Sequence, residues 1–502
     1  MLGWVGLDNV GLGGIESTYD TDIRGKNGRV LIQTDARRRA FNRDERLPTA
    51  GSTVELTIDE YLQHFAEREL HAGVLENRAL GGSAIILNPA TGEILAMANE
   101  PTFNPNAYRD AEDNERRNRA VQDIYEPGST FKVVTASAAI QEHVLKPDAT
   151  IDTNPGQIRI GNRPAIREDG NRNYGVLSFM DVIVKSSNIG AIRIGFRVGP
   201  ERLGRYVSAF GFGKAASPDF PGESSGIVWS ADKLNDSALA SVSMGYQVGV
   251  TALQMVRAVS TVANGGALIE PRLLRAVYRD ERRVSVKPKI SGHTIDPETA
   301  ATLTTIMEQV VERGTAKRAK VPGYTIAGKT GTAQKIINGR YSHSDHVASF
   351  VGFVPSRRPA LAMVVVIDTP KGPNGDHGGS VAAPIFQRIA EASLRYLGVA
   401  PDVNAVPPVL VAARDDDGQP GPPPGPTVKK VVVAAGTVPD VRGLGARQAV
   451  QVLLKAGLNA RVSGDGMVVS QFPTPGEPLE EGAVCRLVLE RSTQRPMEPV
   501  HP

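Results

Sequence analysis

The chain has 502 residues, of which 41% are hydrophobic and 22% charged, as is usual for soluble globular domains. Its net charge is only +3 and no run of Lys and Arg forms a continuous basic face, which argues against nucleic acid as a partner. The single cysteine, Cys485, excludes an internal disulfide framework and a cysteine-rich metal site. No apolar run approaches the roughly 18 residues needed to span a bilayer.

The N-terminal part of the chain alternates β and α signals. Residues 1–50 are rich in Gly and Arg with short apolar stretches, and they predict a fragment of a β-rich region. The next segment, 51–74, predicts a strand followed by an amphipathic helix. Residues 83–99 predict a β-hairpin around the turn Pro-Ala-Thr-Gly, and helical segments dominate 129–314.

The β signal returns after this helical region. Three successive strands with short connections, the first two joined by an Asn-Gly turn, are predicted over 324–336, 346–355 and 360–369. Short connections imply antiparallel pairing. A helix over 384–398 follows. The sequence therefore predicts an α+β domain over 51–400, with one antiparallel sheet built from both of its ends and a helical subdomain inserted between them.

The C-terminal part predicts a separate small module. Residues 401–436 are rich in Pro and Gly and predict a stiff, solvated linker. Beyond the linker, 437–492 contains one amphipathic helix and about three strands, which is a compact α+β module.

The stretch VPGYTIAGKTGTAQ, 321–334, contains G-x-x-x-x-G-K-T, the pattern of a phosphate-binding loop. Such a loop needs a buried strand before it and a helix after it. Here a polar, helix-like segment precedes the pattern and an Asn-Gly hairpin follows it. The later apolar run ending at Asp368 is then a buried strand rather than a magnesium-holding one, and nucleotide binding is disfavoured.

The same stretch also contains K-T-G, at Lys329, Thr330 and Gly331, followed by Thr332. Three residues recur by chance, so the pattern alone is weak. Two further patterns precede it in the order that serine acyl-transferases of the penicillin-recognising type use. They are S-x-x-K and S-x-N, carried by Ser129 and Lys132 and by Ser186 and Asn188.

Each of these residues has a chemical reason to be there. Ser129 follows Pro-Gly and opens a predicted helix, so that its hydroxyl is exposed, and Lys132 one turn later can take the serine proton if its pKa is lowered. Ser186 can relay a proton to the leaving amine, and Asn188 can bind substrate. A strand carrying Lys329, Thr330 and Thr332 can hold a carboxylate and pair with a peptide backbone.

Some similar patterns have simpler explanations. A second S-x-x-K, from Ser230 to Lys233, is better explained by Ser230 as a helix cap. His343 and His346 lie beside a hairpin turn without a carboxylate or cysteine cluster, which predicts surface histidines and no metal site.

With these motifs in place, the chain resembles the class B penicillin-binding proteins, which are peptidoglycan D,D-transpeptidases, and most of all their cell-division type. The resemblance covers nearly the whole chain: 1–50 resembles the end of an N-terminal pedestal (dimerisation) domain, 51–400 the transpeptidase domain and 437–492 a PASTA module. It implies the penicillin-binding/β-lactamase-like fold and a serine-type D-Ala-D-Ala transpeptidase or carboxypeptidase that uses no cofactor.

The resemblance also implies roles for single residues. Ser129 would attack the carbonyl of the penultimate D-alanine of a stem peptide, with Lys132 as base and Ser186 as proton relay. The amides of Ser129 and Thr332 would hold the oxyanion, and Lys329, Thr330 and Thr332 would recognise the terminal carboxylate or that of a β-lactam.

Partners and location follow from the same resemblance. Stem peptides are the expected substrates, β-lactams the inhibitors, and a membrane glycosyltransferase and division proteins the partners. Family members begin with a cytoplasmic tail, a membrane helix and the first part of the pedestal, which this sequence does not show. The expected location is the inner membrane with the catalytic domain outside the cytoplasm.

Three alternatives stay open at the level of sequence. An elongation-type transpeptidase would share all the motifs, and so would a catalytically weak wall-binding sensor or scaffold. A hydrolase of the β-lactamase class would need a water-activating glutamate. The nearest candidate stretch, ADKLN at 231–235, has alanine at that place.

Overall fold

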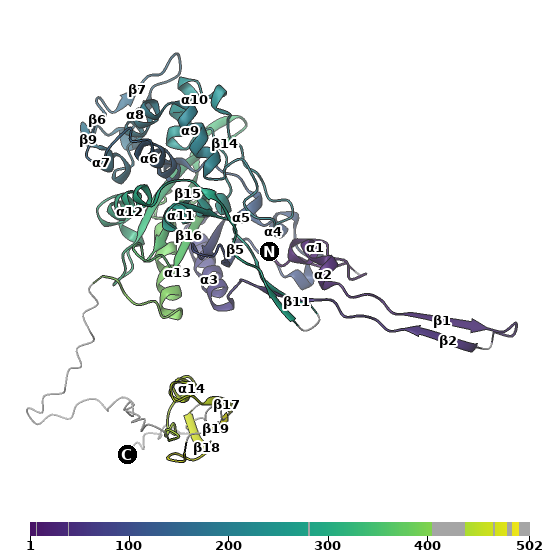
Figure 1. Ribbon diagram of the computed structural model, residues 1–502. Helices are drawn as coiled ribbons and strands as arrows, with labels where there is room; N and C mark the ends of the chain where they lie inside the picture. The colour runs from purple at the N-terminus through teal and green to yellow at the C-terminus, as the bar shows by residue number, and fades with distance from the viewer. Residues whose placement is uncertain are drawn as a thin grey trace, which may run out of the picture. The chain divides into compact units, whose positions relative to one another are not determined.

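The computed structural model describes residues 1–6, 8–38, 40–279, 282–403, 437–464, 467–478 and 484–490 (Figure 1). The chain forms two compact units, Met1–Val409 and Leu410–Pro502, each with its own hydrophobic core. Most of the predicted linker 401–436 lies outside the described residues.

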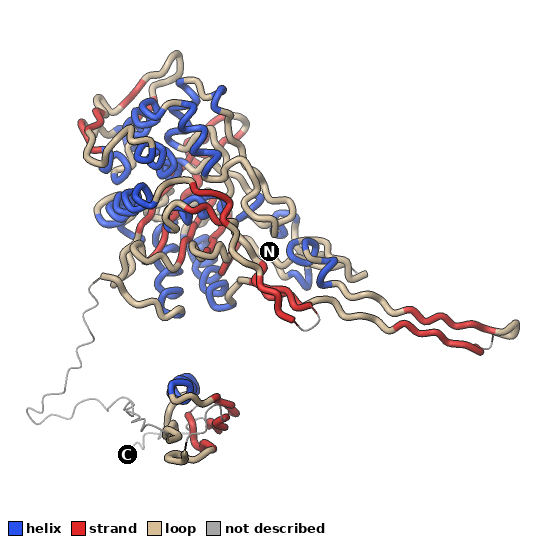
Figure 2. The backbone as a smooth tube through the Cα atoms, viewed as in Figure 1, coloured by secondary structure: helices blue, strands red, loops and turns tan. Residues whose placement is uncertain are grey.

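A five-stranded sheet forms the centre of the first unit (Figure 2). Its order is β14-β15-β16-β4-β5 and every neighbouring pair is antiparallel. The strands are β4 (Gly81–Leu87), β5 (Ile94–Glu100), β14 (Ala327–Ile337), β15 (Arg340–Val354) and β16 (Leu361–Asp368). The two ends of the domain thus share one sheet, which confirms the predicted architecture and both predicted hairpins.

Helices bury both faces of this sheet, which is why β4 and β16 are apolar along nearly their whole length. Helices α3 (Glu60–Glu76) and α13 (Ala382–Tyr396) pack against each other and against one face. Helix α11 (Ala252–Ala263) lies against β15, β16 and β4 on the other face. The Phe350 ring of β15 meets the Phe386 ring of α13 edge to face, with centroids 4.6 Å apart.

A helical region separates the two halves of the sheet, as predicted. Side-chain caps mark several of its helix starts: Ser178, Ser187, Asn235 and Thr251 each accept a hydrogen bond from the first turn. No helix within the described ranges is both long and apolar enough to cross a bilayer. The elements are α4 (Asp113–Arg116), α5 (Arg119–Gln122), η2 (Gly128–Phe131), α6 (Lys132–Gln141), α7 (Phe179–Val184), α8 (Asn188–Val198), α9 (Pro200–Ala209), η4 (Ala231–Lys233), α10 (Asp236–Met244) and α12 (Pro297–Glu312).

Short β-ribbons interrupt the helices, and the sequence did not separate them from loops. Ribbons of two or three residues carry too few alternating positions to give a period-two signal. They pair β6 (Thr150–Asp152) with β9 (Val176–Ser178), β7 (Gln157–Ile158) with β8 (Ile166–Arg167), and β10 (Ala267–Ile269) with β13 (Ile290–His293).

The N-terminal segment contains two short helices and one β-hairpin, joined by loops. After α1 (Gly14–Thr18) and α2 (Asp20–Ile23), the strands β1 (Arg29–Thr34) and β2 (Ala40–Arg46) form an antiparallel hairpin, and β1 is exposed along its length. Strand β3 (Thr53–Leu56) joins β11 (Leu274–Arg279) and β12 (Arg282–Ser285) in a second sheet.

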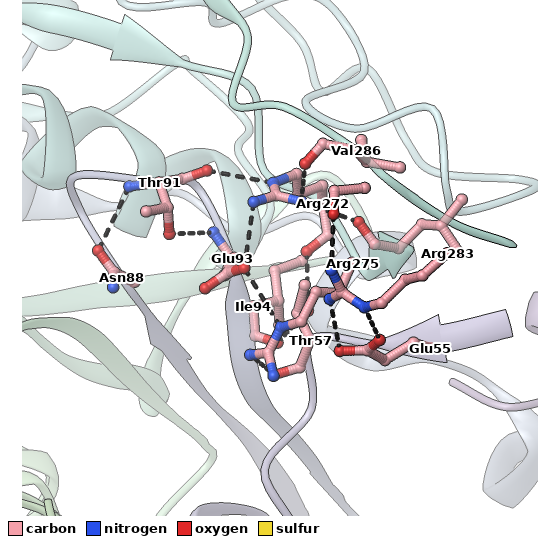
Figure 3. A network of polar contacts seen from close by, with 12 residues as sticks. Glu55, Thr57, Asn88, Thr91, Glu93, Ile94, Arg272, Arg275, Arg283 and Val286 are labelled. Atoms are coloured by element: carbon pink, nitrogen blue, oxygen red, sulfur yellow. Dashed lines mark hydrogen bonds and ion pairs between the residues drawn. The ribbon is translucent and has the colours of Figure 1, made fainter. Parts of the chain in front are cut away.

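A polar network fixes this second sheet to the turn between β4 and β5 (Figure 3). Arg272 is its hub: its guanidinium donates to the carbonyls of Leu274 (3.0 Å) and Val286 (2.9 Å) and pairs with Glu93 at 3.1 Å. Arg275 also pairs with Glu93, at 3.3 Å. Loss of the Arg272 side chain would remove a donor from both carbonyls and one of the two arginines from Glu93.

The C-terminal unit contains the predicted helix and three strands. Helix α14 (Ala446–Lys455) covers a sheet of order β17-β19-β18, in which β17 (Asn459–Gly464) is parallel to β19 (Val484–Glu490) and β18 (Met467–Phe472) antiparallel to it. Strand β19 alternates strictly between exposed and buried residues, so one face of the sheet is in the core and the other in water.

The network around Arg272 predicts that removal of this one side chain lowers the stability of the first unit strongly. Arg272→Ala should destabilise the first unit by about 2–4 kcal/mol, because two carbonyls lose a donor and the Glu93 carboxylate keeps only Arg275. Thermal unfolding followed by circular dichroism measures the loss. Arg313→Ala is the matched control, since Arg313 is 47% exposed in its pair with Asp181 and should cost less than about 1 kcal/mol. Equal losses for the two variants would contradict the hub role of Arg272.

Candidate active site

One cleft of about 470 Å³ lies between β14 and the helical region. Five of the eight predicted site residues line it, namely Ser129, Ser186, Asn188, Thr330 and Thr332. The other three, Lys132, Lys329 and Gly331, are buried directly behind the lining. The structure therefore brings together three motifs that lie far apart in the chain.

Ser129 lies on the turn η2 rather than on the α-helix that the sequence predicts there. Helix α6 begins three residues later, at Lys132. The turn is of 3-10 type, with Gly128 at φ +52°, so that Ser129 and Lys132 are one 3-10 turn apart. The Ser129 side chain is partly exposed in the cleft while Lys132 points into the protein.

The ammonium group of Lys132 is fully buried and surrounded by the second motif. Its Nζ donates to the carbonyl oxygen of Ser186 at 2.7 Å and to Oδ1 of Asn188 at 2.9 Å, and it lies 3.4 Å from Ser186 Oγ. Burial lowers the pKa of Lys132 to about 7, although the carboxylates of Glu168 and Asp169 favour the charged form. A lysine of this kind can accept a proton near neutral pH.

Ser186 lies between two lysines. Lys329 Nζ donates to Ser186 Oγ at 2.9 Å and to the carbonyl of Thr330 at 3.1 Å. Burial, and then repulsion by the charge on Lys132, hold the pKa of Lys329 well below its usual range. The hydroxyl of Ser186 therefore connects Lys132 with Lys329, and a proton can pass along this chain of groups.

Strand β14 forms one wall of the cleft and is the outermost strand of the sheet. Gly331 allows its backbone to approach the Ser129 turn, because a Cβ at this position would lie 2.8 Å from the carbonyl oxygen of Pro127 and 2.4 Å from Ser349 Oγ. Thr330 shares a 2.7 Å hydrogen bond with Thr315, and Thr332 accepts one of 3.1 Å from the amide of Gly378. An outermost strand beside the cleft can add an extended peptide as a further strand.

The cleft also contains groups that the motifs do not include. His377 Nε2 lies 3.5 Å from Asp169, and its Nδ1 lies 2.8 Å from Asp376. Hydrogen bonding to Asp169 raises the pKa of His377 to about 9, so this pair is ionic at neutral pH. His346 also pairs with Asp376, at 2.8 Å.

The prediction of two surface histidines is wrong for His346. Its side chain is only 14% exposed and lines the cleft, while His343 is exposed as predicted. His346 is the seventh residue after the hairpin's Gly339, and β15 carries it back along β14 to face Gln334. The distance of His346 from the turn could be read from the sequence. How far the two strands of the hairpin stay paired beyond the turn could not, and this pairing places His346 at the cleft.

The phosphate-loop pattern and the second S-x-x-K belong to other structures. The residues after Gly328 continue as strand β14, so no helix N-terminus is present to bind a phosphate. Ser230 flanks the short turn η4 and Lys233 is exposed, away from the cleft lining. The residues with described positions contain no cluster of three potential metal ligands.

Comparison with known proteins agrees with this geometry. Residues 82–391 match the penicillin binding protein transpeptidase domain and residues 436–491 match the PASTA domain. The chain is 34% identical to stage V sporulation protein D of Bacillus subtilis, over 99% of this chain and 74% of that protein. It is 33% identical to the peptidoglycan D,D-transpeptidase FtsI of Escherichia coli K12, over 80% of this chain and 66% of FtsI.

Solved structures show the same likeness. A crystal structure of penicillin binding protein 3 from Mycobacterium tuberculosis in complex with aztreonam superposes with a TM-score of 0.71 at 30% identity, covering 80% of this chain and 90% of that one. The match in sequence spans more than half of the chain and the match in structure includes the central sheet. The chain therefore belongs to the class B penicillin-binding proteins, with a serine transpeptidase domain followed by a PASTA domain.

Proposed function

We propose that this peptidoglycan D,D-transpeptidase uses Ser129 as its nucleophile and the neutral amine of Lys132 as the base. The observation that supports this most is the burial of Lys132 and Lys329 around Ser186, directly behind the turn from which Ser129 lines the cleft. A buried amine with a pKa near 7 is unprotonated in a large share of molecules at neutral pH.

In the first half of the reaction, Ser129 Oγ attacks the carbonyl carbon of the penultimate D-alanine and its proton passes to Lys132. The amides of Ser129 and Thr332 stabilise the oxyanion. The C–N bond to the last D-alanine then breaks, and the leaving amine takes a proton through Ser186. An ester between Ser129 and the stem peptide remains.

In the second half, an amine of a neighbouring stem peptide attacks this ester. It loses a proton along the same path, and the new amide bond forms the cross-link while Ser129 Oγ regains its proton. Strand β14 supports the peptide as an added strand, with Thr330, Thr332 and Lys329 near the terminal carboxylate. A β-lactam carries a carboxylate beside its reactive carbonyl and would occupy the same place as an inhibitor.

The setting of the enzyme is proposed on the likeness to its relatives. We assign it to septal wall synthesis at the outer side of the inner membrane, with residues 1–50 as the end of a pedestal domain and 437–492 as a wall-facing module. A sporulation role is the second candidate, since the relative that matches 99% of this chain is named for stage V of sporulation. Depletion distinguishes the two: filamentous cells favour the septal role and normal growth with defective spores favours the other.

The nucleophile is tested by covalent labelling with a fluorescent penicillin. The parent protein should form an adduct that lasts many minutes, and Ser129→Ala should form none, because the ester needs this hydroxyl. Ser230→Ala is the matched control and should label like the parent, since Ser230 belongs to the other S-x-x-K pattern and lies outside the cleft lining. Labelling of Ser129→Ala would refute the assignment, and rapid loss of the parent's adduct would indicate a hydrolase.

The base is tested by the pH dependence of acylation. Below its pKa the fraction of neutral Lys132 rises about tenfold per pH unit, so the second-order rate constant should rise with pH and level off above about 7. Stopped-flow fluorescence with a labelled penicillin measures this profile. Lys335→Gln, which changes a lysine of β14 paired with Asp368, should leave it unchanged. A rate that keeps rising towards the ordinary lysine pKa of about 10.4 would exclude Lys132 as the lowered base.

The close approach of β14 to the nucleophile turn gives a third prediction. Gly331→Ala should slow acylation at least about tenfold, since its Cβ would push β14 away from Pro127 and Ser349. The rate constant for penicillin acylation and the melting temperature are both measured. Gly292→Ala is the control, because a Cβ there meets nothing within 4 Å. Wild-type acylation by Gly331→Ala would show that the spacing of β14 from the turn is not critical.

A further inference from the structure

A buried carboxylate stands directly behind the S-x-N motif. Glu168, in the segment between β8 and η3 (Asp169–Asn171), is only 3% exposed. It accepts hydrogen bonds from the backbone amides of Asn188 (2.6 Å) and Ile189 (3.2 Å) and from the hydroxyl of Ser187. All three donors belong to the start of helix α8.

These contacts complete the N-terminus of α8. The first amides of a helix have no partner inside it. Here the amide of Gly190 donates to Ser187 Oγ at 2.9 Å and that of Ala191 to the Ser187 carbonyl at 3.2 Å, so that Glu168 takes the two that remain. The positive end of the helix dipole and three hydrogen-bond donors offset the cost of burying the carboxylate.

The turn that Glu168 holds is the one that carries the motif. Ser186 precedes the cap and has φ +60°, a left-handed conformation that costs a serine energy unless its surroundings impose it. Asn188 is held twice by the same segment, since its amide donates to Glu168 and its Nδ2 to the carbonyl of Arg167 at 3.2 Å. Lys132 Nζ takes its acceptors from these two motif residues.

The negative charge of Glu168 also acts on the ammonium group of Lys132. The charged groups around the Lys132 ammonium are the carboxylates of Glu168 and Asp169, from the segment that follows β8, and Lys329 from β14. The carboxylate of Asp169 also forms an ion pair with His377. The carboxylate of Glu168, in contrast, accepts its hydrogen bonds from uncharged groups. Glu168 is thus the stronger of the two carboxylate influences that favour the protonated form of Lys132.

We propose that Glu168 is a positioning residue of the acylation reaction: its carboxylate fixes the first turn of α8, and with it Ser186 and Asn188, and its charge governs the proton on Lys132. Glu168 is buried behind the cleft lining and acts through these residues without touching substrate. This inference rests on the proposed function, in which Lys132 is the base and Ser129 the nucleophile.

The test is Glu168→Gln in the full chain. Glutamine keeps the shape but loses the charge and offers one acceptor oxygen where the carboxylate offers two. The second-order rate constant for acylation by a fluorescent penicillin is measured from pH 5 to 9, with the melting temperature as a companion. The plateau at high pH should fall at least about tenfold. The midpoint of the acid limb should move to lower pH, because Lys132 loses a neighbouring negative charge.

Two further variants make the result specific. Glu168→Asp keeps the charge on a shorter side chain, and its midpoint should return to the parent value while its plateau stays below that of the parent. Glu142→Gln is the matched control: Glu142 lies at the other end of α6, and its carboxylate accepts a hydrogen bond from the Tyr206 hydroxyl at 3.0 Å, so the substitution should leave both plateau and midpoint unchanged.

The inference is overturned if Glu168→Gln acylates with the parent's plateau and midpoint. It is also overturned if the plateau falls while the midpoint stays in place, since loss of packing alone would explain that. If Glu168→Gln does not fold, Glu168→Asp decides: a reduced plateau with the parent's midpoint supports the inference, and an unchanged plateau or a shifted midpoint refutes it. Failure of the proposed function is recognised separately, as a parent protein whose labelling does not depend on Ser129.

Discussion

Two lysine ammonium groups that share one serine hydroxyl set the chemistry of this domain. Lys132 Nζ and Lys329 Nζ lie 3.4 Å and 2.9 Å from Ser186 Oγ, and both side chains are fully buried. Two like charges so close together in a region of low polarity cannot both persist, so the pair holds fewer protons than two exposed lysines would. Burial lowers the pKa of Lys132 to about 7, and burial together with repulsion by Lys132 holds the pKa of Lys329 well below its usual range.

This arrangement requires that the sheet and the helical region keep a fixed separation, because each supplies one lysine. Several contacts maintain it. The missing side chain of Gly331 lets β14 lie against the Ser129 turn, Thr332 accepts from Gly378, and the ion pair of Asp169 with His377 joins the two sides of the cleft. Each of these contacts contributes little to the stability of the domain, but each helps to fix the separation between the sheet and the helical region. Proton transfer depends on this separation.

Much of the fold could be predicted from the sequence because its signals are local. The turn Asn338–Gly339 and the apolar runs of β15 and β16 are short-range patterns, and the order of the three motifs indicated which distant segments must meet. The start of α6 was harder: Ser129 lies on a 3-10 turn, and the sequence pattern of such a turn does not differ from that of a first helical turn.

The residues that surround the three motifs could not be predicted in the same way. Glu168 belongs to the polar run Arg-Glu-Asp-Gly, which resembles any solvated turn, and only the fold places its carboxylate at the start of α8. His346 and His377 reach the cleft through strand register and through the path of the chain after β16, neither of which is encoded in neighbouring residues. Residues that act through tertiary contacts leave no periodic pattern to detect.

The strand order has a consequence for how the enzyme comes into existence. Leu87 of β4 pairs with Ala362 of β16, so the centre of the sheet joins two segments at opposite ends of the domain. A ribosome releases β4 and Ser129 long before Lys329 and β16, and the partly made chain must close a very long loop before these strands can pair. Reactivity towards penicillins should therefore be absent from a nascent domain and appear only once synthesis has passed β16.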